Sequence, residues 1–302
     1  MKYKILLDCD PGHDDAIAIM LASSFPIIDL KGISVVSGNQ TLDKTAVNAY
    51  NVSRYLNNNV PICKGSDRPL KRSRLNCGEI HGESGLDGFI FPTYDFEYDS
   101  RDVEDFIYEI AKENKKIIMV TTGPMTNLAK ALNKYPDLNR YIEKIIIMGG
   151  STDKGNISPY AEFNILADAE AAKICFESNI PFRMIGLNVT RKVLVLPNIM
   201  ERMAKINTPK ADLFNKLMVF FNKTQKEVFN LDGGPLHDPV TMVSLIDESV
   251  LEYQMMDVEI NISNTERYGE SVCKINPKGK IEVATKIDVD KYWDIIEEAL
   301  KN

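Results

Sequence analysis

Hydrophobic residues recur with two different periods along the first half of the chain. Short runs rich in β-branched residues predict strands, which fall at residues 3–8, 31–37, 116–121, 144–148 and 181–187. Segments with apolar residues three or four positions apart predict helices, which fall at residues 14–24, 42–57, 101–113, 126–134 and 168–177. Strands that alternate with helices in this way are typical of an α/β fold with a mostly parallel sheet.

Two later features of the pattern refine this expectation. Residues 117–120 and 145–148 are apolar at every position, as expected of strands that carry helices on both faces of the sheet. Thr208-Pro209 has the composition of a helix start, and we expect a helix from there to about residue 230.

The end of the sequence indicates a different arrangement. Residues 272–275 and 281–287 flank the turn sequence Asn276-Pro277-Lys278-Gly279, and a last helix is expected from Asp290. We therefore expect one α/β domain over residues 1–302, with a mostly parallel central sheet flanked by helices and a small antiparallel C-terminal extension. Residues 64–88 form a long polar segment, and long loops in such folds are often functional.

Composition and charge argue against several classes of protein. The chain is 44% hydrophobic and 26% charged, which is ordinary for a folded globular protein. Its net charge of -7 argues against general binding to nucleic acid, because phosphate contacts need an excess of Lys and Arg. No apolar run reaches the roughly 20 residues of a membrane span. The five cysteines contain no C-x-x-C pair, and no leader precedes the first strand, so we expect a cytoplasmic protein without zinc or disulfides.

The densest chemistry lies in D-C-D-P-G-H-D-D, residues 8–15, between the first strand and the first helix. Loops at the carboxyl ends of strands bind ligands in open α/β sheets. Carboxylates this close repel one another unless a cation neutralises them. Oxygen ligands favour Ca²⁺ or Mg²⁺ over zinc, and Ca²⁺ accepts carboxylates and carbonyls in a flexible shell. The segment therefore predicts a divalent metal site.

Two other interpretations of the acidic segment are available. Asp14 and Asp15 could merely occupy the positive end of a helix, where an acid contributes about 0.3–1 kcal/mol, but this leaves Asp8 and Asp10 unexplained. A phosphotransferase of the haloacid-dehalogenase type also opens with Asp-x-Asp after a strand. The Pro-Gly-x-Asp-Asp continuation is out of place in that class.

The same segment resembles the signature of the inosine-uridine nucleoside hydrolases, and other motifs of that family follow in order along nearly the whole chain. These are SGNQT at 37–41, IHGESGLDG at 80–88, TGPMTNL at 122–128, MGG at 148–150, AEFN at 161–164 and PLHD at 235–238. The sequence most closely resembles the bacterial pyrimidine-specific ribonucleoside hydrolases. The resemblance implies hydrolysis of the N-glycosidic bond of a ribonucleoside, to ribose and free base, by a calcium-bound water.

The resemblance also implies which residues hold the calcium ion. These are Asp10, Asp15, Asp238 and the backbone carbonyl of Thr122. Asp10 would in addition remove a proton from the water as general base. Taken without the other motifs, His237 and Asp238 would fit better as a surface histidine beside a capping aspartate at the start of a helix over 240–245, and the other motifs reverse this interpretation.

Ribose recognition needs polar groups that satisfy several hydroxyls in a buried pocket. By resemblance these are Asp14, Asn39, Glu162, Asn164 and Asp238, with Phe163 between two of them. Residues 162–164 are expected in a loop between a buried strand and the next helix. Asn39 alone would also fit an ordinary turn residue. A negatively charged pocket would stabilise the oxocarbenium-like transition state of glycoside hydrolysis.

Three histidines lie inside the family motifs, and histidine is suited to protonate a leaving base. His237 is the first candidate for this general acid. His81 is the second, because its glycine-rich surroundings predict a mobile loop over the pocket. His13 is expected to have a structural role.

The preference for a base rests on two positions of the helix that begins after Thr208. Gln225 matches a glutamine that pyrimidine-preferring members use near the base, whereas Phe229 replaces a tyrosine that they tend to carry. Residues four apart share a helix face, so both could face the base. Phe229 lacks the hydroxyl of that tyrosine, which removes one possible step in the transfer of a proton to the base. How the leaving base is protonated is therefore not determined by these two residues.

Several alternatives remain at this point. A purine or broad-specificity (inosine-uridine) nucleoside hydrolase would carry the same motifs. A non-catalytic, calcium-dependent sugar-binding protein is the alternative outside enzymes, but it would have no use for a general base at Asp10 and a general acid at His237. The expected partner is a small ribonucleoside, with no nucleic acid or membrane. The family resemblance implies a homo-oligomer, a dimer or a tetramer.

Overall fold

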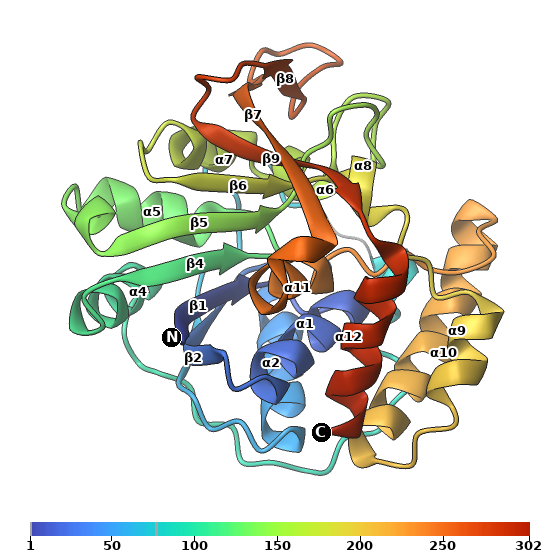
Figure 1. Ribbon diagram of the computed structural model, residues 1–302. Coiled ribbons are helices and arrows are strands. Elements are labelled where there is room, and N and C mark those ends of the chain that lie inside the picture. Colours follow the sequence, from blue (N-terminus) through green and yellow to red (C-terminus); the bar gives the residue numbers. More distant parts are fainter. Residues whose placement is uncertain (1, 76–77) are drawn as a thin grey trace.

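The computed structural model describes residues 2–75 and 78–302, and one mixed sheet crosses the whole of this part (Figure 1). Its strands are β1 (Tyr3–Cys9), β2 (Ile28–Val35), β3 (Ile62–Lys64), β4 (Ile117–Thr121), β5 (Ile142–Met148), β6 (Phe182–Ile185), β7 (Leu251–Ile260), β8 (Ser271–Ile275) and β9 (Ile281–Ile287). Their order in the sheet is β3-β2-β1-β4-β5-β6-β9-β7-β8.

Helices connect the strands. They are α1 (His13–Ser24), α2 (Leu42–Tyr55), α3 (Gly78–His81), α4 (Val103–Glu113), α5 (Thr126–Lys134), α6 (Phe163–Ala167), α7 (Ala169–Phe176), α8 (Leu187–Thr190), α9 (Pro197–Met203), α10 (Pro209–Phe229), α11 (Pro239–Ile246) and α12 (Val289–Lys301). Two short 3-10 helices, Leu138–Arg140 and Glu248–Val250, complete the chain.

The two faces of the sheet support two separate cores. Along β1, Ile5 and Leu7 pack with residues of α1, α2, α10, α11 and α12, whereas Leu6 packs on the other face with residues of α4, α5 and α7. Figure 1 shows the same division, with α4, α5 and α7 on one side of the strands and α1, α11 and α12 on the other. Neighbouring side chains of a strand point to opposite faces, so strands that are apolar throughout can serve both cores.

The parallel part of the sheet agrees with the sequence pattern. Strands β1 to β6 pair in parallel, and the helices between them lie close to the expected ranges. Strand β2 begins at Ile28 rather than at residue 31. The α/β fold with a mostly parallel sheet is therefore confirmed.

The C-terminal extension is antiparallel, as expected, but its central strand was not predicted. Strand β7 runs antiparallel to both β8 and β9, and Met256 is the partner of Ile275 and of Ile281. The turn at 276–279 thus joins two strands that pair with β7. The alternation of β7 changes phase at Met255-Met256, which explains why it does not read as one strand.

The parallel strands change direction of winding beside β1. The chain passes from β1 to β2 on one side, while β4 lies on the other side of β1 and leads on to β5. Ligands of open α/β sheets bind at such a switch point, outside the carboxyl ends of the strands. The acidic segment that follows β1 therefore lies where a ligand is expected.

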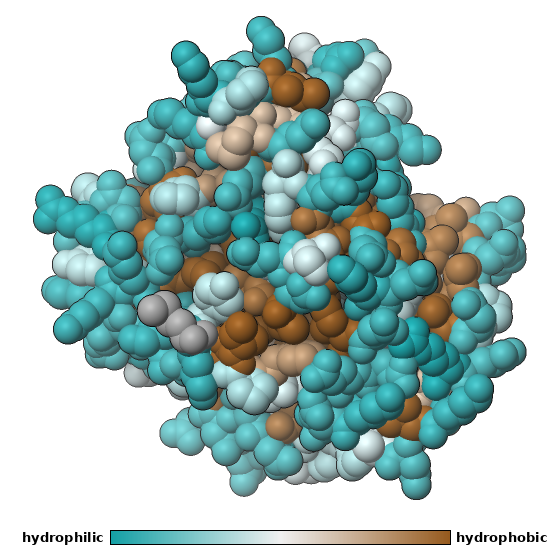
Figure 2. Space-filling model, in the orientation of Figure 1, coloured by the Kyte–Doolittle hydropathy of each residue, from teal (hydrophilic) through white to brown (hydrophobic). Residues whose placement is uncertain are grey.

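Figure 2 shows one face that is mostly hydrophilic, with hydrophobic residues gathered in a band across its middle. Among the helices of the described residues, none has the length and apolar character needed to cross a bilayer. The expected long polar segment at 64–88 contains the end of β3 and the short helix α3, and two of its residues, 76 and 77, lie outside the described part.

Candidate active site

A cavity of about 510 Å³ opens at the carboxyl ends of the parallel strands. Its walls come from the turns after β2, β4 and β5, from helices α1, α3, α6, α8 and α10, and from the segment that leads into α11. The expected site residues that line it are Asp14, Asn39, His81, Thr122, Glu162, Phe163, Asn164, Gln225, His237 and Asp238. Asp10 and Asp15 are completely buried beneath it.

Three carboxylates form an acidic cluster on this cavity. Asp14, Asp15 and Asp238 each offer an oxygen within 4.8 Å of the others, and all three are buried. Asp238 stands at the N-cap position of α11, but its side chain makes no capping hydrogen bond. The interpretation of Asp238 as a mere capping residue is therefore wrong, because its carboxylate belongs to the cluster.

Asp10 lies beside the acidic cluster with one oxygen held and one oxygen free. Its Oδ2 accepts a hydrogen bond from the backbone N–H of Asn39 at 2.7 Å. Its Oδ1 is buried and has no partner among the described residues. A Cβ atom at Gly38 would lie 2.0 Å from Oδ2, and one at Gly123 would lie 2.6 Å from Oδ1. Two glycines thus allow the backbone to close around this carboxylate.

Polar side chains join Asp15 to its surroundings. Its carboxylate accepts hydrogen bonds from the hydroxyl of Thr122 at 2.7 Å and from the backbone N–H of Gly12 at 3.0 Å. The Asn39 amide donates both to this carboxylate and to the backbone carbonyl of Asp10, each at 3.1 Å. Asn39 therefore links two expected metal ligands and is more than a turn residue.

The electrostatics of the cluster call for a cation. Burial, with repulsion from Asp15, raises the pKa of the Asp14 carboxyl to about 7. Burial likewise raises the pKa values of Asp10 and Asp238 well above the usual range, and the neighbouring carboxylates add to the effect. A bound divalent ion would remove this penalty, and an all-oxygen donor set with one free buried oxygen fits Ca²⁺ or Mg²⁺.

Asp8 does not belong to the acidic cluster, contrary to the expectation that all four acids of the segment act together. Its Oδ1 accepts hydrogen bonds from the Ser34 hydroxyl at 2.6 Å and from the Asn127 amide at 2.8 Å. Asp8 is part of strand β1, so these contacts lie between β1 and its neighbours. The acids that gather at the cavity are Asp10, Asp14 and Asp15, with Asp238 from the other end of the chain.

The expected loop at 162–164 is in fact the start of a helix. Glu162 is the N-cap of α6, and its carboxylate accepts hydrogen bonds from the backbone N–H groups of Asn164, Ile165 and Gly150. The Glu162 carboxylate satisfies N–H groups at the start of the helix that have no partner within it, which stabilises a helix at this point. Burial raises the pKa of the Glu162 carboxyl to about 7.

Asn164 connects two strand ends. Its Nδ2 donates to the backbone carbonyls of Thr122 at 2.8 Å and Met148 at 3.1 Å. Both bonds use the amide nitrogen, which leaves its carbonyl oxygen for a ligand in the cavity. The Thr122 carbonyl, expected as a metal ligand, is thus also oriented by Asn164.

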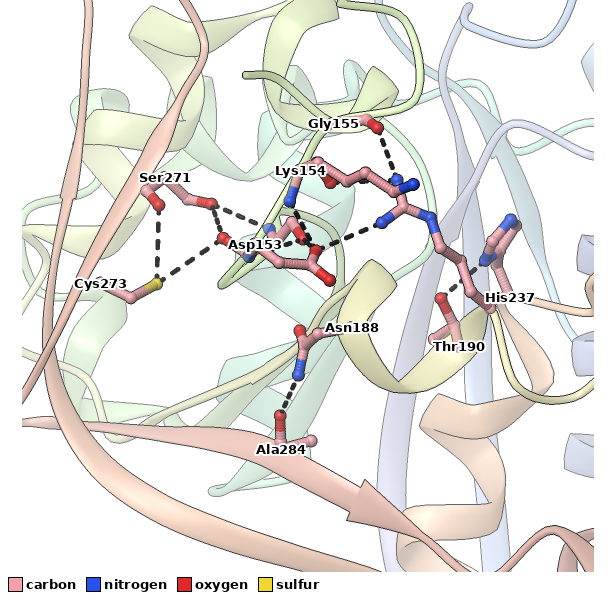
Figure 3. Close-up of polar contacts among 11 residues, drawn as sticks. Asp153, Lys154, Gly155, Asn188, Thr190, His237, Ser271, Cys273 and Ala284 are labelled. Carbon is pink, nitrogen blue, oxygen red and sulfur yellow. Dashed lines mark hydrogen bonds and ion pairs between the residues drawn. The ribbon is translucent and has the colours of Figure 1, made fainter. Parts of the chain in front are cut away.

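His237 faces the cavity beside the acidic cluster. Its Nδ1 lies 2.7 Å from the hydroxyl of Thr190, the last residue of α8 (Figure 3). Burial lowers the pKa of His237 to about 3, and the nearby Arg191 guanidinium contributes in the same direction. The ring is therefore neutral at physiological pH.

His81 was expected in a mobile, glycine-rich loop. It lies instead at the end of the short helix α3. Its ring stacks on those of His13 and Phe221, and its Nδ1 lies 3.1 Å from Nδ1 of His13. The Thr224 hydroxyl of α10 donates to the carbonyl of Ile80 at 2.7 Å, which fastens the helix. His81 lines the cavity, whereas His13 is completely buried behind it, in accord with a structural role.

Helix α10 forms part of the cavity wall, where Phe221 stacks on the ring of His81. Phe221, Gln225 and Phe229 of this helix line the cavity together. Gln225 is buried, while Phe229 is 43% exposed at the last turn, where the backbone of Asn230 turns to a left-handed conformation and ends the helix. The two residues whose spacing predicted a shared face do share it.

Several residues that line the cavity were not anticipated as site residues. They are Met148, Lys154, Asn156, Leu187, Arg191, Phe221 and others, and Thr190 stands directly behind His237. Met148 lies in one of the quoted motifs, so its position was available as a signal. Arg191 and Thr190 carry no such signal, because their role depends on contacts between segments far apart in the sequence.

Arg191 fastens the loop that follows β5. Its guanidinium contacts the carboxylate of Asp153 at 3.2 Å and donates to the carbonyl of Lys154 at 3.0 Å. Figure 3 shows Asp153, Lys154 and Gly155 close together, with Thr190 and His237 beside them. The loop over the mouth of the cavity is thus held to α8.

Comparisons with known proteins agree with this geometry. The sequence model of the family described as inosine-uridine preferring nucleoside hydrolase matches residues 5–294. Pyrimidine-specific ribonucleoside hydrolase RihB of Escherichia coli (strain K12) is 41% identical over 305 residues, which cover 99% of this chain and 97% of that protein. The solved structure of a plant nucleoside hydrolase, the PpNRh1 enzyme, has a TM-score of 0.93 at 27% identity and covers 100% of this chain and 99% of its own. A purine-preferring ribonucleoside hydrolase from Gardnerella vaginalis has a TM-score of 0.92 at 29% identity, with coverages of 99% and 98%.

Proposed function

The chain belongs to the inosine-uridine preferring nucleoside hydrolase family, and from this premise we propose that it hydrolyses pyrimidine ribonucleosides with a calcium ion in its acidic cluster. As a member of that family it is an N-glycosyl hydrolase that acts on ribonucleosides. The finer proposal concerns the base, the metal and the roles of individual residues.

One observation carries the proposal: a buried Asp10 carboxylate with a free oxygen stands beside three further carboxylates under a cavity of about 510 Å³. Asp10, Asp15, Asp238 and the Thr122 carbonyl would hold Ca²⁺, and Asp14 lies close enough to contribute as well. When bound, the ion would lower the pKa of a water molecule and so provide a nucleophile at neutral pH. Asp10 Oδ1 is available to accept the proton of that water.

The polar residues above the cluster are suited to hold ribose. Asp14, Asp238 and Asn164 line the cavity with oxygen atoms that can accept hydrogen bonds from hydroxyls. Asn39, Glu162 and Phe163 line the same cavity. The negative charge of these carboxylates would stabilise the positive charge that develops on the sugar as the N-glycosidic bond breaks.

Two histidines face the part of the cavity where the base would lie. His237 is the proposed donor to the leaving base, and His81 would contact the base from the α3 side. Gln225 and Phe229 would pack on the base from α10. The buried amide of Gln225 offers both a donor and an acceptor, which suits the carbonyl and N–H edge of uracil.

The preference for pyrimidines rests on Gln225 and on the name of the bacterial relative, RihB. A purine nucleoside is the second candidate, because a structural neighbour is described as purine-preferring and because Phe229 lacks the hydroxyl expected of pyrimidine-preferring members. A sugar-binding protein without catalysis is disfavoured, since the family is one of hydrolases and such a protein would have no use for a general base at Asp10 together with a proton donor at His237.

Three expectations from the sequence are carried over as proposals. The chain forms one domain over residues 1–302, works in the cytoplasm and assembles as a dimer or tetramer. Free cysteines, among which Cys9, Cys63 and Cys175 are buried, support a reducing compartment. Cys77 lies outside the described residues.

A panel of nucleosides tests the proposal. Uridine, cytidine, inosine, adenosine and 2'-deoxyuridine would each be incubated with the protein, and free reducing sugar would be measured. We expect uridine and cytidine to be hydrolysed with the highest kcat/KM. Higher values for inosine or adenosine would establish the purine alternative, and no release of ribose from any of them would refute hydrolysis. Elemental analysis of the purified protein would identify the ion.

A further inference from the structure

We propose that Thr190 is a positioning residue that fixes the tautomer of His237, so that the ring nitrogen on the cavity side carries the hydrogen. This inference deepens the proposed function and rests on it for its catalytic meaning. Thr190 is not part of any motif that pointed to the site, and its role comes from a contact between two distant segments.

The hydrogen bond between Thr190 and His237 is short and partly buried. The hydroxyl oxygen lies 2.7 Å from Nδ1 of the ring, and Thr190 has no exposed surface. The backbone N–H of Thr190 is already used, since it donates to the carbonyl of Gly186 at 3.2 Å. Within the described part of the chain, the ring nitrogen is the hydrogen-bond partner of this hydroxyl.

The hydroxyl must therefore be the donor of this hydrogen bond. A buried hydroxyl proton needs an acceptor, and Nδ1 of His237 provides one when it carries a lone pair. If Nδ1 carried a hydrogen, it would donate to Thr190, and the hydroxyl proton would be left buried without a partner. A neutral imidazole with a lone pair at Nδ1 has its hydrogen at Nε2.

The two segments that carry these residues are joined by backbone hydrogen bonds. Leu236 N–H donates to the carbonyl of Val193 at 3.1 Å, Val195 N–H donates to that of Gly234 at 2.9 Å, and Leu194 pairs with Pro235 between them. Helix α8 is itself anchored at the end of β5, because Leu187 N–H donates to the carbonyl of Gly150 at 2.9 Å. The backbone that carries Thr190 and the backbone that carries His237 are thus held next to each other.

The free nitrogen of His237 points away from Thr190 (Figure 3), and the ring lines the cavity next to Asp238 of the acidic cluster. An Nε2–H at this place is a hydrogen-bond donor toward the leaving base. As the N-glycosidic bond breaks, its electron pair moves to the base, and this N–H stabilises the negative charge without being given up. The base takes its proton from solvent, while the proton of the attacking water goes to Asp10. A neutral histidine that acts as donor is a known catalytic arrangement.

Two readouts test the proposal independently of each other. The chain has three histidines, so ¹⁵N labelling of histidine gives three imidazole rings, and the ring that is lost in His237→Ala is that of His237. We expect ¹⁵N shifts and couplings that assign hydrogen to Nε2 of His237 in the wild type and in Thr190→Ser. In Thr190→Val, which keeps the shape and removes the hydroxyl, we expect the Nδ1–H form to become populated. Hydrogen at Nδ1 in the wild type would overturn the proposal.

Kinetics provide the second readout. Thr190→Val should lower kcat for uridine by about tenfold or more with little change in KM, while Thr190→Ser should restore most of it. Hydrolysis of p-nitrophenyl riboside, whose leaving group needs no such donor, should be nearly unchanged. Equal losses on both substrates would mean that Thr190 serves only the structure. Thr45→Val, a buried threonine of α2 that bonds the carbonyl of Val36, is the matched control and should keep both activities.

The two failures can be told apart. If the wild type releases ribose from no nucleoside, the proposed function is wrong, whereas the ¹⁵N spectrum still decides the tautomer. If hydrolysis occurs but Thr190→Val keeps the wild-type tautomer and rate, the proposal for Thr190 is wrong and the proposed function stands.

Discussion

The two oxygens of the Asp10 carboxylate have different environments. One is held by the backbone of Asn39, and the other is buried without a partner among the described residues. Asp8 Oδ2 is likewise buried without a partner in the described part of the chain, but the free oxygen of Asp10 belongs to a carboxylate that lies among the other acids under the cavity, where a bound cation would offset its cost. The close approach of Gly38 and Gly123 keeps the side chain in this orientation.

Replacement of Asp10 by asparagine tests this interpretation. Asp10→Asn keeps the shape and the acceptor for Asn39 but removes the charge and the base, so kcat for uridine should fall by about 10²–10⁴-fold or more. Steady-state release of ribose measures the effect. Asp8→Asn is the matched control, because Asp8 lies two residues earlier and outside the acidic cluster. Similar kcat values for Asp10→Asn and the wild type would remove Asp10 from the mechanism.

His237 gives a second prediction for single residues. Removal of a preorganised donor from a developing anion typically lowers rates by about 10²–10³-fold, so His237→Ala should lose this much kcat on uridine. It should retain most activity on p-nitrophenyl riboside. His81→Ala should act more weakly and on KM as well. If His81→Ala lost more kcat than His237→Ala on uridine, and not on p-nitrophenyl riboside, His81 rather than His237 would be the donor to the base.

Individual elements show what the sequence could and could not predict. The strand before residue 9 and the helix after residue 13 were evident from periodicity, and the acids between them therefore fell at the carboxyl edge of the sheet. Asp8 lies close in sequence to the acidic cluster but still within β1, where its side chain points to one face of the sheet, and sequence proximity alone does not reveal this. The contact of Thr190 with His237 spans 47 positions, and no periodic pattern reports such a contact.

In helix α10, the spacing of two residues correctly predicted which helix face they share. Gln225 and Phe229 were expected on one face because they are four positions apart, and both line the cavity. The helix begins at the capping threonine and proline that predicted it, and it ends at Phe229, one residue before the expected limit. The element could be predicted, whereas its packing against α3 through Thr224 could not.

Gln225 at this helix should influence the choice of base. Gln225→Leu preserves volume but removes the hydrogen bonds to the base, so KM for uridine should rise by about tenfold. Activity on p-nitrophenyl riboside should change little, since that leaving group does not use them. Initial-rate measurements with both substrates decide the matter. Lys226→Ala, at an exposed neighbour that pairs with Asp232, should leave KM unaltered, and an unaltered KM in Gln225→Leu would place the base elsewhere.

The acidic cluster is assembled from two segments that lie far apart in the sequence. Asp14 and Asp15 follow the first strand, while Asp238 begins α11, and α1 packs against α11. The folded state therefore holds carboxyls whose charged forms are disfavoured, and a bound cation should offset this cost. Stability should consequently depend on calcium and on pH together.

The direction of this dependence follows from the raised pKa values. The pKa of Asp14 is about 7 in the folded chain against 3.8 ordinarily, so between these values the unfolded chain binds fewer protons. Metal-free protein should therefore lose stability as pH rises from about 4 to 7. Added Ca²⁺ should raise Tm, and by more at pH 7 than at pH 5, because protons compete with the ion for the carboxylates. Thermal unfolding after EDTA treatment, with Mg²⁺ for comparison, measures both; an equal rise at the two pH values would contradict the linkage.

The contact of Asp238 with the segment after β1 also affects the kinetics of folding. The acidic cluster cannot exist until α11 has docked on α1, and such contacts between distant segments form late in folding. An ion that binds only the completed cluster stabilises the native state more than the transition state before it. Calcium should then leave the rate of refolding almost unaltered and slow unfolding, so the ion would lengthen the lifetime of the native enzyme under proteolysis or heat.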